Sequence, residues 1–282
     1  MTQDNSAQIA NWNTKSGVSW SAHQDRFAAM LAPFRDQLIA AAVVRAGEQV
    51  LDIGCGSGDT VAAFARLAGP GCVTGVDVSE PLLAQARAAT QDLGVELILA
   101  DASHHDFGGK RFDLLASKFG VMFFADPGAA FARLGANLHD KGRLAAVAWR
   151  STRENEAAWL PFEAARDLLP PLPPADPEAP GPFSFGDRDR VLRILKDGGF
   201  RDIAIEPFDA PLHFGAGEGA EGQLDDAVDM AFHLGPLRRL LDGQSEAVRQ
   251  EACARVRTRF ADRLTPDGVI LNGAAWLITA TV

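Results

Sequence analysis

The stretch that decides the fold is Val50-Leu51-Asp52-Ile53-Gly54-Cys55-Gly56-Ser57-Gly58. Its apolar start predicts a strand over 49–53, three alternate glycines follow, and the pattern of 59–68 predicts a helix. Alternate glycines remove side chains where the backbone must turn tightly, and they let a ligand approach main-chain N–H groups near a helix N-terminus. The motif therefore predicts a turn that binds a nucleotide-like ligand.

Short apolar runs alternate with helical patterns beyond this motif. Strands are predicted over 73–77, 95–100, 112–117 and 144–149, and crossover helices over 59–68, 81–93 and 127–139. Strands rich in Val, Ile and Leu with little alternation are typical of a parallel sheet that is buried on both faces. Right-handed crossovers then place helices on both sides, so the predicted fold class is α/β with a doubly wound sheet.

The composition limits the classes of partner. The chain has 282 residues, of which 47% are hydrophobic, so it can bury a substantial core. Lys and Arg total 27 against 37 Asp and Glu, which gives a net charge of -10. The averaged field of such a protein repels phosphate backbones, so we expect a small-molecule substrate and no nucleic acid.

The cysteines and the N-terminal sequence predict a compartment. Cys55, Cys72 and Cys253 are an odd number without C-x-x-C spacing, which argues against a disulfide framework and against a zinc site. The start of the chain, Met1 to Asn5, lacks the features of a signal peptide, and no apolar stretch approaches the length of a membrane span. We therefore expect a soluble, cytoplasmic protein with no metal and no membrane partner.

A dinucleotide site is the competing interpretation of the glycine turn. The dinucleotide fingerprint G-x-G-x-x-G, counted from Gly54, needs glycine at position 59, where this chain has Asp59. Asp52 is also foreign to that fingerprint. An anion beside a pyrophosphate is unfavourable, whereas an anion beside an ammonium and a sulfonium is favourable.

The segment from Asp52 to Gly58 resembles the glycine-rich motif of class I S-adenosylmethionine-dependent methyltransferases. The resemblance implies a Rossmann-like sheet that is mostly parallel with a final antiparallel strand, plus a helical N-terminal leader and a mainly helical insertion. It also implies that Gly54, Cys55, Gly56 and Gly58 surround the methionine and ribose parts of S-adenosylmethionine, with Asp52 on the amino end of the cofactor.

Two more acidic residues follow strands where this family places cofactor contacts. Asp77 ends the second strand and can accept hydrogen bonds from both ribose hydroxyls, as it would in a dinucleotide enzyme too. Asp101 follows the third strand, and the resemblance implies that it accepts a hydrogen bond from the adenine amino group. Their neighbours Val78 and Ala102, and Lys118 at the end of the fourth strand, complete the expected cofactor site.

The remaining sequence is assigned to parts of a single methyltransferase domain over 1–282. We expect a helical N-terminal cap over 1–47, a cofactor-binding core over 48–150, a proline-rich insertion with a sixth strand over 151–206, a mainly helical insertion over 207–270, and a final strand over 271–282. The proline-rich part contains Pro170-Pro171-Leu172-Pro173-Pro174, which suits neither a helix nor an interior strand.

The acceptor of the methyl group is expected to be a small molecule with an O, N, S or C nucleophile. The Asn or Asp-Pro-Pro-aromatic sequence of DNA and RNA amino-methyltransferases is absent after the fourth strand, and the core is similar to that of the ubiquinone and menaquinone C-methyltransferase group. The predicted substrate pocket consists of Trp20, His23, Phe119, Met122, Phe123 and Arg150.

Methyl transfer from a sulfonium is an in-line displacement that needs no covalent side chain, and only some acceptors need a base. His23 is the candidate base, with a solvent-facing helical histidine as the other interpretation. The alternatives to a methyltransferase are a nicotinamide-dependent oxidoreductase and a non-catalytic cofactor-binding protein.

Overall fold

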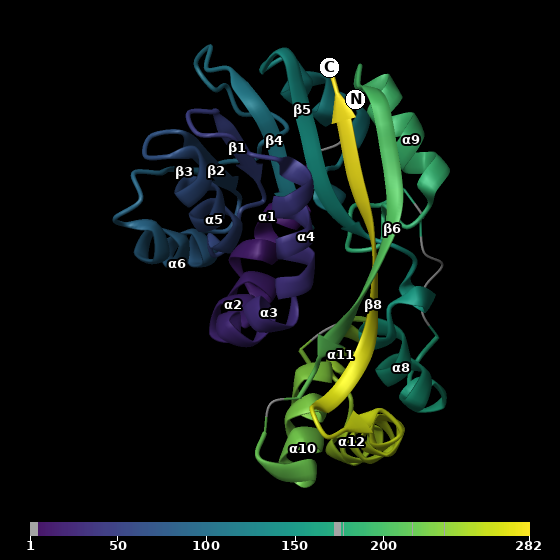
Figure 1. The fold of residues 1–282 in the computed structure, drawn as a ribbon. Coiled ribbons are helices and arrows are strands. Elements are labelled where there is room, and N and C mark those ends of the chain that lie inside the picture. Colours follow the sequence, from purple (N-terminus) through teal and green to yellow (C-terminus); the bar gives the residue numbers. More distant parts are fainter. Residues whose placement is uncertain (1–4, 172–175, 177, 216, 234) are drawn as a thin grey trace. The chain divides into compact units, whose positions relative to one another are not determined.

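The computed structural model describes residues 5–171, 176, 178–215, 217–233 and 235–282, and the chain divides into two units (Figure 1). The first unit comprises Met1–Trp149, Glu178–Phe208 and Ala275–Val282, and the second comprises Arg150–Pro177 and Asp209–Ala274. The predicted glycine turn lies in the first unit. Leu172 to Ala175 and Pro177, which include part of the predicted proline-rich insertion, lie outside the described residues.

The main sheet is organised around the strand that precedes the glycine turn. The strands, in spatial order, are β3 (Glu96–Leu99), β2 (Val73–Asp77), β1 (Val50–Ile53), β4 (Phe112–Lys118), β5 (Leu138–Trp149), β8 (Gly268–Thr281) and β6 (Arg201–His213). β1 pairs in parallel with β2 and β4, β2 pairs in parallel with β3, and β4 pairs in parallel with β5. β5 and β8 are antiparallel, with Arg143 opposite Thr281 and Trp149 opposite Ala275.

This topology confirms the predicted α/β class, including the late antiparallel strand. The strand order reverses between β1 and β4, so the loops after these two strands diverge on either side of a topological switch point. Ligands of doubly wound sheets bind at such a point, at the carboxyl ends of the strands. The glycine turn after β1 occupies this position.

Helices flank the sheet of the first unit. The leader comprises α1 (Ser6–Asn13), α2 (Lys15–Ala22), α3 (Gln24–Met30) and α4 (Ala32–Ala42), and the helices between and after the strands are α5 (Asp59–Ala68), α6 (Glu80–Thr90), α7 (Pro127–Gly135) and α9 (Arg188–Asp197). α4 packs on β4 and β5, α2 packs on α6, and α5 packs on β1 and β2. Short 3-10 turns occupy Val121–Phe123, Thr152–Glu154 and Arg166–Leu168.

The core of the first unit holds β1, and with it the start of the glycine turn, in place. Every residue of Val50–Ile53 is buried, and Leu51 and Ile53 belong to one hydrophobic cluster that also includes Phe131 and Phe185. α5 buries Val61 and Phe64 completely on its sheet-facing side. The glycine turn is thus held by a buried strand before it and an amphipathic helix after it.

The second unit contains α8 (Glu156–Ala165), α10 (Gly219–Ala231), α11 (Gly235–Leu241), α12 (Glu246–Ala261) and the short strand β7 (Leu264–Thr265). α8 packs on α11 and α12, and α10 packs on α12. Phe214 and Phe260 meet edge to face with ring centroids 5.7 Å apart. The mainly helical insertion expected over 207–270 thus contains α10, α11 and α12.

Several predicted boundaries were wrong, all near the long strands. The crossover helix predicted over 127–139 ends at Gly135, and β5 begins at Leu138 rather than at 144. β6 extends to His213, past residue 206 where the segment with the sixth strand was expected to end, and β8 begins at Gly268 rather than at 271. Polar residues at these strand ends carry no apolar signal, and cross-strand pairing alone extends the strands.

Among the described residues, no helix combines the length and the apolar character that crossing a membrane requires.

Candidate functional site

The three glycines of the turn differ in the atoms that surround them. Their φ angles are 66° at Gly54, 55° at Gly56 and 88° at Gly58, values that favour glycine. A methyl group added at Gly54 would lie 2.7 Å from the Cα of Gly120, and one at Gly58 would lie 3.0 Å from the Cβ of Ala86. At Gly56 an added methyl group would meet no atom within 4 Å. Gly54 and Gly58 therefore permit close packing, whereas Gly56 leaves open space beside its backbone.

Asp77 holds this turn from the end of β2. Its Oδ2 accepts a hydrogen bond of 2.8 Å from the backbone N–H of Gly56, and its Oδ1 accepts one of 2.8 Å from the N–H of Ser79. Burial raises the pKa of Asp77 above its usual value, although these two backbone donors act in the opposite direction. Each carboxylate oxygen has a second acceptor position, so Asp77 can also bind two neighbouring hydroxyls.

Asp52 is the most unusual group of the site. Its side chain is 0% exposed, and its Oδ2 accepts a hydrogen bond from the hydroxyl of Thr60, but none of the described residues donates to Oδ1. Burial raises the pKa of Asp52 to about 7, and the carboxylates of Asp59 and Asp77 act in the same direction. A buried acceptor without a donor is costly, and an ammonium group would satisfy it. The site therefore fits the amino end of S-adenosylmethionine.

Lys118, which the sequence predicts as part of the cofactor site, forms an ion pair. It lies at the end of β4 and pairs with Asp59, the first residue of α5, and the two side chains are only 13% and 20% exposed. The positive charge of Lys118 lowers the pKa of Asp52, while the negative charge of Asp59 raises it. Lys118 thus acts on the predicted cofactor site through charge. No local pattern indicates that Asp59 pairs with Lys118, because the two residues are 59 positions apart in the chain.

Asp101 lies after β3 in a dense hydrogen-bond network. Its Oδ1 accepts from the backbone N–H of Ser103 at 2.9 Å and from the Ser103 hydroxyl at 2.6 Å, and its Oδ2 accepts from Nδ2 of Asn5 at 3.0 Å. Burial acts to raise the pKa of Asp101, but the hydrogen bonds from Ser103 and Asn5 outweigh it and lower the pKa. The next residue, Ala102, is buried in the core cluster of the first unit.

The leader helix α1 reaches the loop after β2, which the sequence did not predict. Nδ2 of Asn13 donates to the carbonyl oxygen of Val78 at 2.7 Å, and its Oδ1 accepts from the N–H of Glu80 at 3.0 Å. The Ser79 hydroxyl donates to the carbonyl oxygen of Trp12 at 2.7 Å. The Asn13 side chain therefore bonds to the carbonyl of Val78 and to the N–H of Glu80, as the backbone of a neighbouring strand would. A polar residue on a helix carries no sequence signal for such a contact.

The aromatic residues after β4 form two groups. Phe119 stacks on Trp149 with centroids 4.0 Å apart and planes 15° apart, and Phe34 contacts both rings edge to face. Phe123 meets Trp12 edge to face at 5.3 Å. Phe119 and Phe123 are half-buried and follow the same strand end as Lys118, where the sequence places the substrate pocket.

The remaining predicted pocket residues are distributed more widely. Met122 is only 1% exposed and its sulfur accepts a hydrogen bond from the Trp149 N–H, so its side chain belongs to the core. Trp20 stacks on Phe27 at 4.1 Å, and Nδ1 of His23 lies 2.9 Å from the carbonyl oxygen of Ser19. Both lie in the leader. Cys55 is buried beside Gly75, where burial raises its pKa well above the usual value of a thiol.

Arg150 is part of the second unit. Its guanidinium pairs with Glu154 and, at 2.8 Å, with Asp209. The first unit thus brings together the glycine turn, Asp52, Asp77 and Lys118, joins Asp101 to the leader through Asn5, and does not include Arg150.

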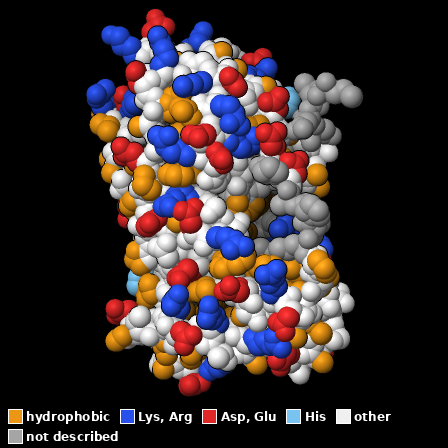
Figure 2. All heavy atoms as spheres, turned by 90° about the vertical axis from the view of Figure 1, so that its right-hand side faces the viewer, with side chains coloured by type: hydrophobic (Ala, Val, Ile, Leu, Met, Phe, Trp, Pro, Cys, Tyr) orange, Lys and Arg blue, Asp and Glu red, His pale blue; other side chains and the backbone are white. Residues whose placement is uncertain are grey.

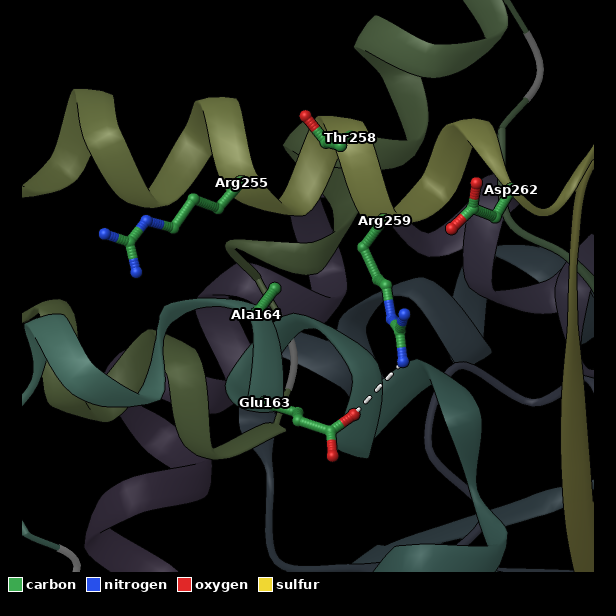
Figure 3. A pocket seen from close by; sticks show the side chains of 6 residues that line it. All are labelled: Glu163, Ala164, Arg255, Thr258, Arg259 and Asp262. Atoms are coloured by element: carbon green, nitrogen blue, oxygen red, sulfur yellow. Dashed lines mark hydrogen bonds and ion pairs between the residues drawn. The ribbon is translucent and has the colours of Figure 1, made fainter.

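A pocket of about 410 Å³ opens between α8 and α12 of the second unit (Figure 3). Arg259 of α12 points toward Glu163 of α8, and the two side chains pair at 3.4 Å. Ala164, Arg255, Thr258 and Asp262 complete its lining. The pocket includes none of the residues predicted for the cofactor site, and its walls are charged and open to solvent. We therefore place the functional site at the glycine turn and not in this pocket.

Part of this chain is similar to known methyltransferases. Residues 50–142, from β1 into β5, match the family described as methyltransferase domain. The ubiquinone/menaquinone biosynthesis C-methyltransferase of Cupriavidus pinatubonensis is 36% identical over 133 residues, which cover 46% of this chain and 52% of that protein. The aklanonic acid methyltransferase of a Streptomyces species is 36% identical over 103 residues, 35% of this chain and 47% of that protein. The chain thus spans about half the length of the curated relatives that it matches.

A solved structure resembles a larger part of the fold. This structure is the magnesium protoporphyrin IX methyltransferase from Synechocystis PCC 6803, solved with bound SAH. The two chains have a TM-score of 0.54 and are 18% identical, and the matched part covers 74% of this chain and 93% of the other chain. Its similarity extends beyond the segment that the family matches. Over residues 50–142 this chain is therefore similar to the family described as methyltransferase domain.

Proposed function

We propose that this protein transfers the methyl group of S-adenosylmethionine to a small-molecule acceptor. The observation that supports this most directly is the unsatisfied, fully buried Oδ1 of Asp52 below a turn whose central glycine, Gly56, leaves open space. A positively charged amino group fits this acceptor, whereas a pyrophosphate does not.

Different residues of the first unit would bind different parts of the cofactor. Asp52 would hold the ammonium group of the cofactor, the open backbone at Gly56 would allow close approach, and Asp77 would accept hydrogen bonds from the ribose hydroxyls. When bound, S-adenosylmethionine supplies an electrophilic methyl group on a sulfonium. The protein's part is to exclude water and to align the acceptor, for which no covalent side chain is needed.

A small organic acceptor agrees with the charge and with the relatives. The net charge is -10, and on the face drawn in Figure 2 the described Lys and Arg side chains lie among Asp and Glu rather than in a basic strip. The named relatives methylate compounds of quinone biosynthesis and aklanonic acid. The half-buried rings of Phe119, Phe123 and Trp149 would suit an acceptor with an apolar body. His23 remains our candidate base for acceptors that must lose a proton.

A reducing cytoplasm is the proposed location. Cys55, Cys72 and Cys253 are all free thiols, so nothing in the cysteine content calls for an oxidising compartment.

Titration calorimetry with S-adenosylmethionine, S-adenosylhomocysteine and NADH tests the cofactor. We expect the two sulfur nucleosides to bind and NADH not to bind. Gly56→Ala should weaken binding at least about tenfold, because its methyl group enters the open space and steric exclusion of a ligand costs more than one lost hydrogen bond.

Gly47→Ala is the matched control for this variant. Gly47 also has a positive φ, 85°, and no atom within 4 Å of an added methyl group, but it precedes β1 at the other end of the strand. It should lose similar stability and keep full affinity. Tight binding of NADH alone would reject the proposal.

Incubation with a metabolite panel and detection of released S-adenosylhomocysteine then tests catalysis, and no turnover with any fraction would favour a non-catalytic binding protein.

A further inference from the structure

Thr60, the second residue of α5, uses its hydroxyl in an unusual way for a buried helical threonine. The residue is only 2% exposed. Buried threonines in helices often bond back to a carbonyl of the preceding turn, as Thr90 does in α6, where its hydroxyl donates to the carbonyl oxygen of Ala86 at 2.7 Å. Thr60 instead donates to Oδ2 of Asp52 on β1. The hydroxyl therefore joins the helix after the glycine turn to the strand before it.

This hydroxyl is the only hydrogen-bond donor to Asp52 among the described residues, because Oδ1 has none. A hydroxyl carries a single hydrogen, and Oδ2 receives it. A hydrogen bond to an ionised carboxylate stabilises the charged form and is stronger than one to a neutral group. Thr60 therefore opposes the burial of Asp52, which favours a protonated and neutral side chain.

The other titratable groups that face Asp52 come from the turn and from three elements. Asp59 of α5 and Lys118 of β4 form an ion pair, and their charges shift the pKa of Asp52 in opposite directions. Asp77 of β2 raises the pKa of Asp52. The Cys55 thiol in the turn is neutral, because burial raises its pKa well above the usual value. The hydrogen bond from the α5 hydroxyl is thus the largest influence that favours the charged form of Asp52.

We propose that Thr60 is a positioning residue that holds Asp52 as an anion beneath the glycine turn, where its negative charge attracts the ammonium group of the cofactor. This inference rests on the proposed function. Loss of the hydroxyl leaves the buried carboxylate without a donor among the described residues, so Asp52 takes up a proton and no longer attracts a cation. Thr60 needs no contact with the cofactor, because it acts through the charge of Asp52.

The test measures by calorimetry the Kd of S-adenosylhomocysteine and the Kd of its analogue that lacks the amino group, between about pH 6 and about pH 8. The ratio of the two isolates the contribution of the ammonium group, which stays protonated over this range. In the wild type, the preference for S-adenosylhomocysteine should grow by up to about tenfold as the pH rises, because Asp52, with a pKa of about 7, becomes ionised.

Thr60→Val removes the hydroxyl and keeps the shape of the side chain. It should move the midpoint of this pH dependence upward by about one pH unit, as the loss of one hydrogen bond to a charged group requires. The preference at about pH 7 should fall by about fivefold, because a smaller fraction of Asp52 is ionised. Thr60→Ser, which keeps a hydroxyl, should restore the wild-type profile.

Thr90→Val is the matched control. Thr90 is also 2% exposed, but its hydroxyl donates within α6 and not to Asp52. It should leave the ratio and its pH midpoint unchanged.

A Thr60→Val protein with the wild-type ratio at every pH would overturn the inference and leave the proposed function standing. The same holds for a Thr60→Ser protein that loses the preference as the valine variant does, and for a wild type whose preference does not change with pH. A folded wild type that binds neither compound would overturn both the inference and the proposed function.

Discussion

Asp52 lies fully buried below the glycine turn, and its charge changes near neutral pH because burial raises its pKa to about 7. The pKa of an aspartate in an unfolded chain lies near 3.8. A raised pKa in the folded state contributes stability that is complete below pH 3.8 and is lost as the pH rises toward 7. Without ligand, the protein should therefore lose stability as the pH rises from about 4 to about 7.

Asp52→Asn should remove most of this pH dependence. The neutral amide has no charge to desolvate, so the loss of unfolding free energy on going from pH 5 to pH 8 should shrink by about 1–3 kcal/mol, as one strongly shifted carboxyl allows. Urea unfolding at the two pH values measures it. Asp77, whose pKa is also raised by burial, should leave a smaller slope of the same sign in the variant. Equal slopes in wild type and variant would contradict the assignment.

The same residues show what local sequence can predict about a site. The spacing of Gly54, Gly56 and Gly58 was enough to predict the turn, since each glycine adopts the positive φ that the motif implied. The spacing could not show which glycines allow close packing, because Gly54 and Gly58 pack against Gly120 and Ala86, which are distant in the sequence. The roles assigned to Asp52 and Asp77 stay predictions, supported by their burial and hydrogen bonds.

At the scale of elements, the turn after β1 and the turn after β4 are packed against each other. A methyl group added to Gly120 would lie 2.5 Å from the carbonyl oxygen of Ile53 and 2.9 Å from the Cα of Gly54. Both neighbours are backbone atoms, so neither can move without disturbing β1. The Ser117 hydroxyl, which donates to the same carbonyl at 2.7 Å, strengthens this junction.

Gly120→Ala should therefore destabilise the fold by about 2 kcal/mol or more, as overpacking against backbone does. Gly128→Ala is the control within the neighbouring helix α7, where the nearest atom to an added methyl group is 3.6 Å away. It should be neutral or gain up to about 1 kcal/mol from helix propensity. Thermal and urea unfolding of the two variants provide the comparison, and equal stabilities would show that the junction tolerates displacement.

Element boundaries were predictable where burial is continuous. β1 and β2 lie where the apolar runs predicted them, because strands buried on both faces are mostly apolar. The start of β5 was missed because His139, Asp140 and Lys141 are exposed and polar, and the pairing of Leu138 with Phe112 extends the strand past them. The leader was predicted as helical, but its contacts with the loop after β2 depend on single polar residues such as Asn13.

At the scale of the whole molecule, cofactor binding should stabilise the first unit by mass action. A ligand present at one hundred times its Kd adds about 2.7 kcal/mol to the free energy of unfolding if it binds only the folded state. Four of the five tryptophans, Trp12, Trp20, Trp149 and Trp276, belong to the first unit, so tryptophan fluorescence reports its unfolding. S-adenosylhomocysteine should shift the fluorescence-detected urea transition upward, and NADH should not. A shift of equal size with NADH would contradict the predicted selectivity.

The division into two units is a property of the whole chain. The second unit is assembled from Arg150–Pro177 and Asp209–Ala274, and the long strands β6 and β8 each have residues in both units. The prediction of a single methyltransferase domain with the stated boundaries stays a prediction, as does the part of the insertions in binding the acceptor.

The sequence by itself determined the class of sheet, the glycine turn and the acidic residues at the strand ends, because each depends on neighbouring residues and on the period of the apolar pattern. Only the tertiary structure decided that β8 lies between β5 and β6, that Lys118 pairs with Asp59, and that Asn5 reaches Asp101. The two side-chain contacts join residues that are 59 and 96 positions apart, and burial and hydrogen bonding in three dimensions determine the partners, for which no local pattern exists.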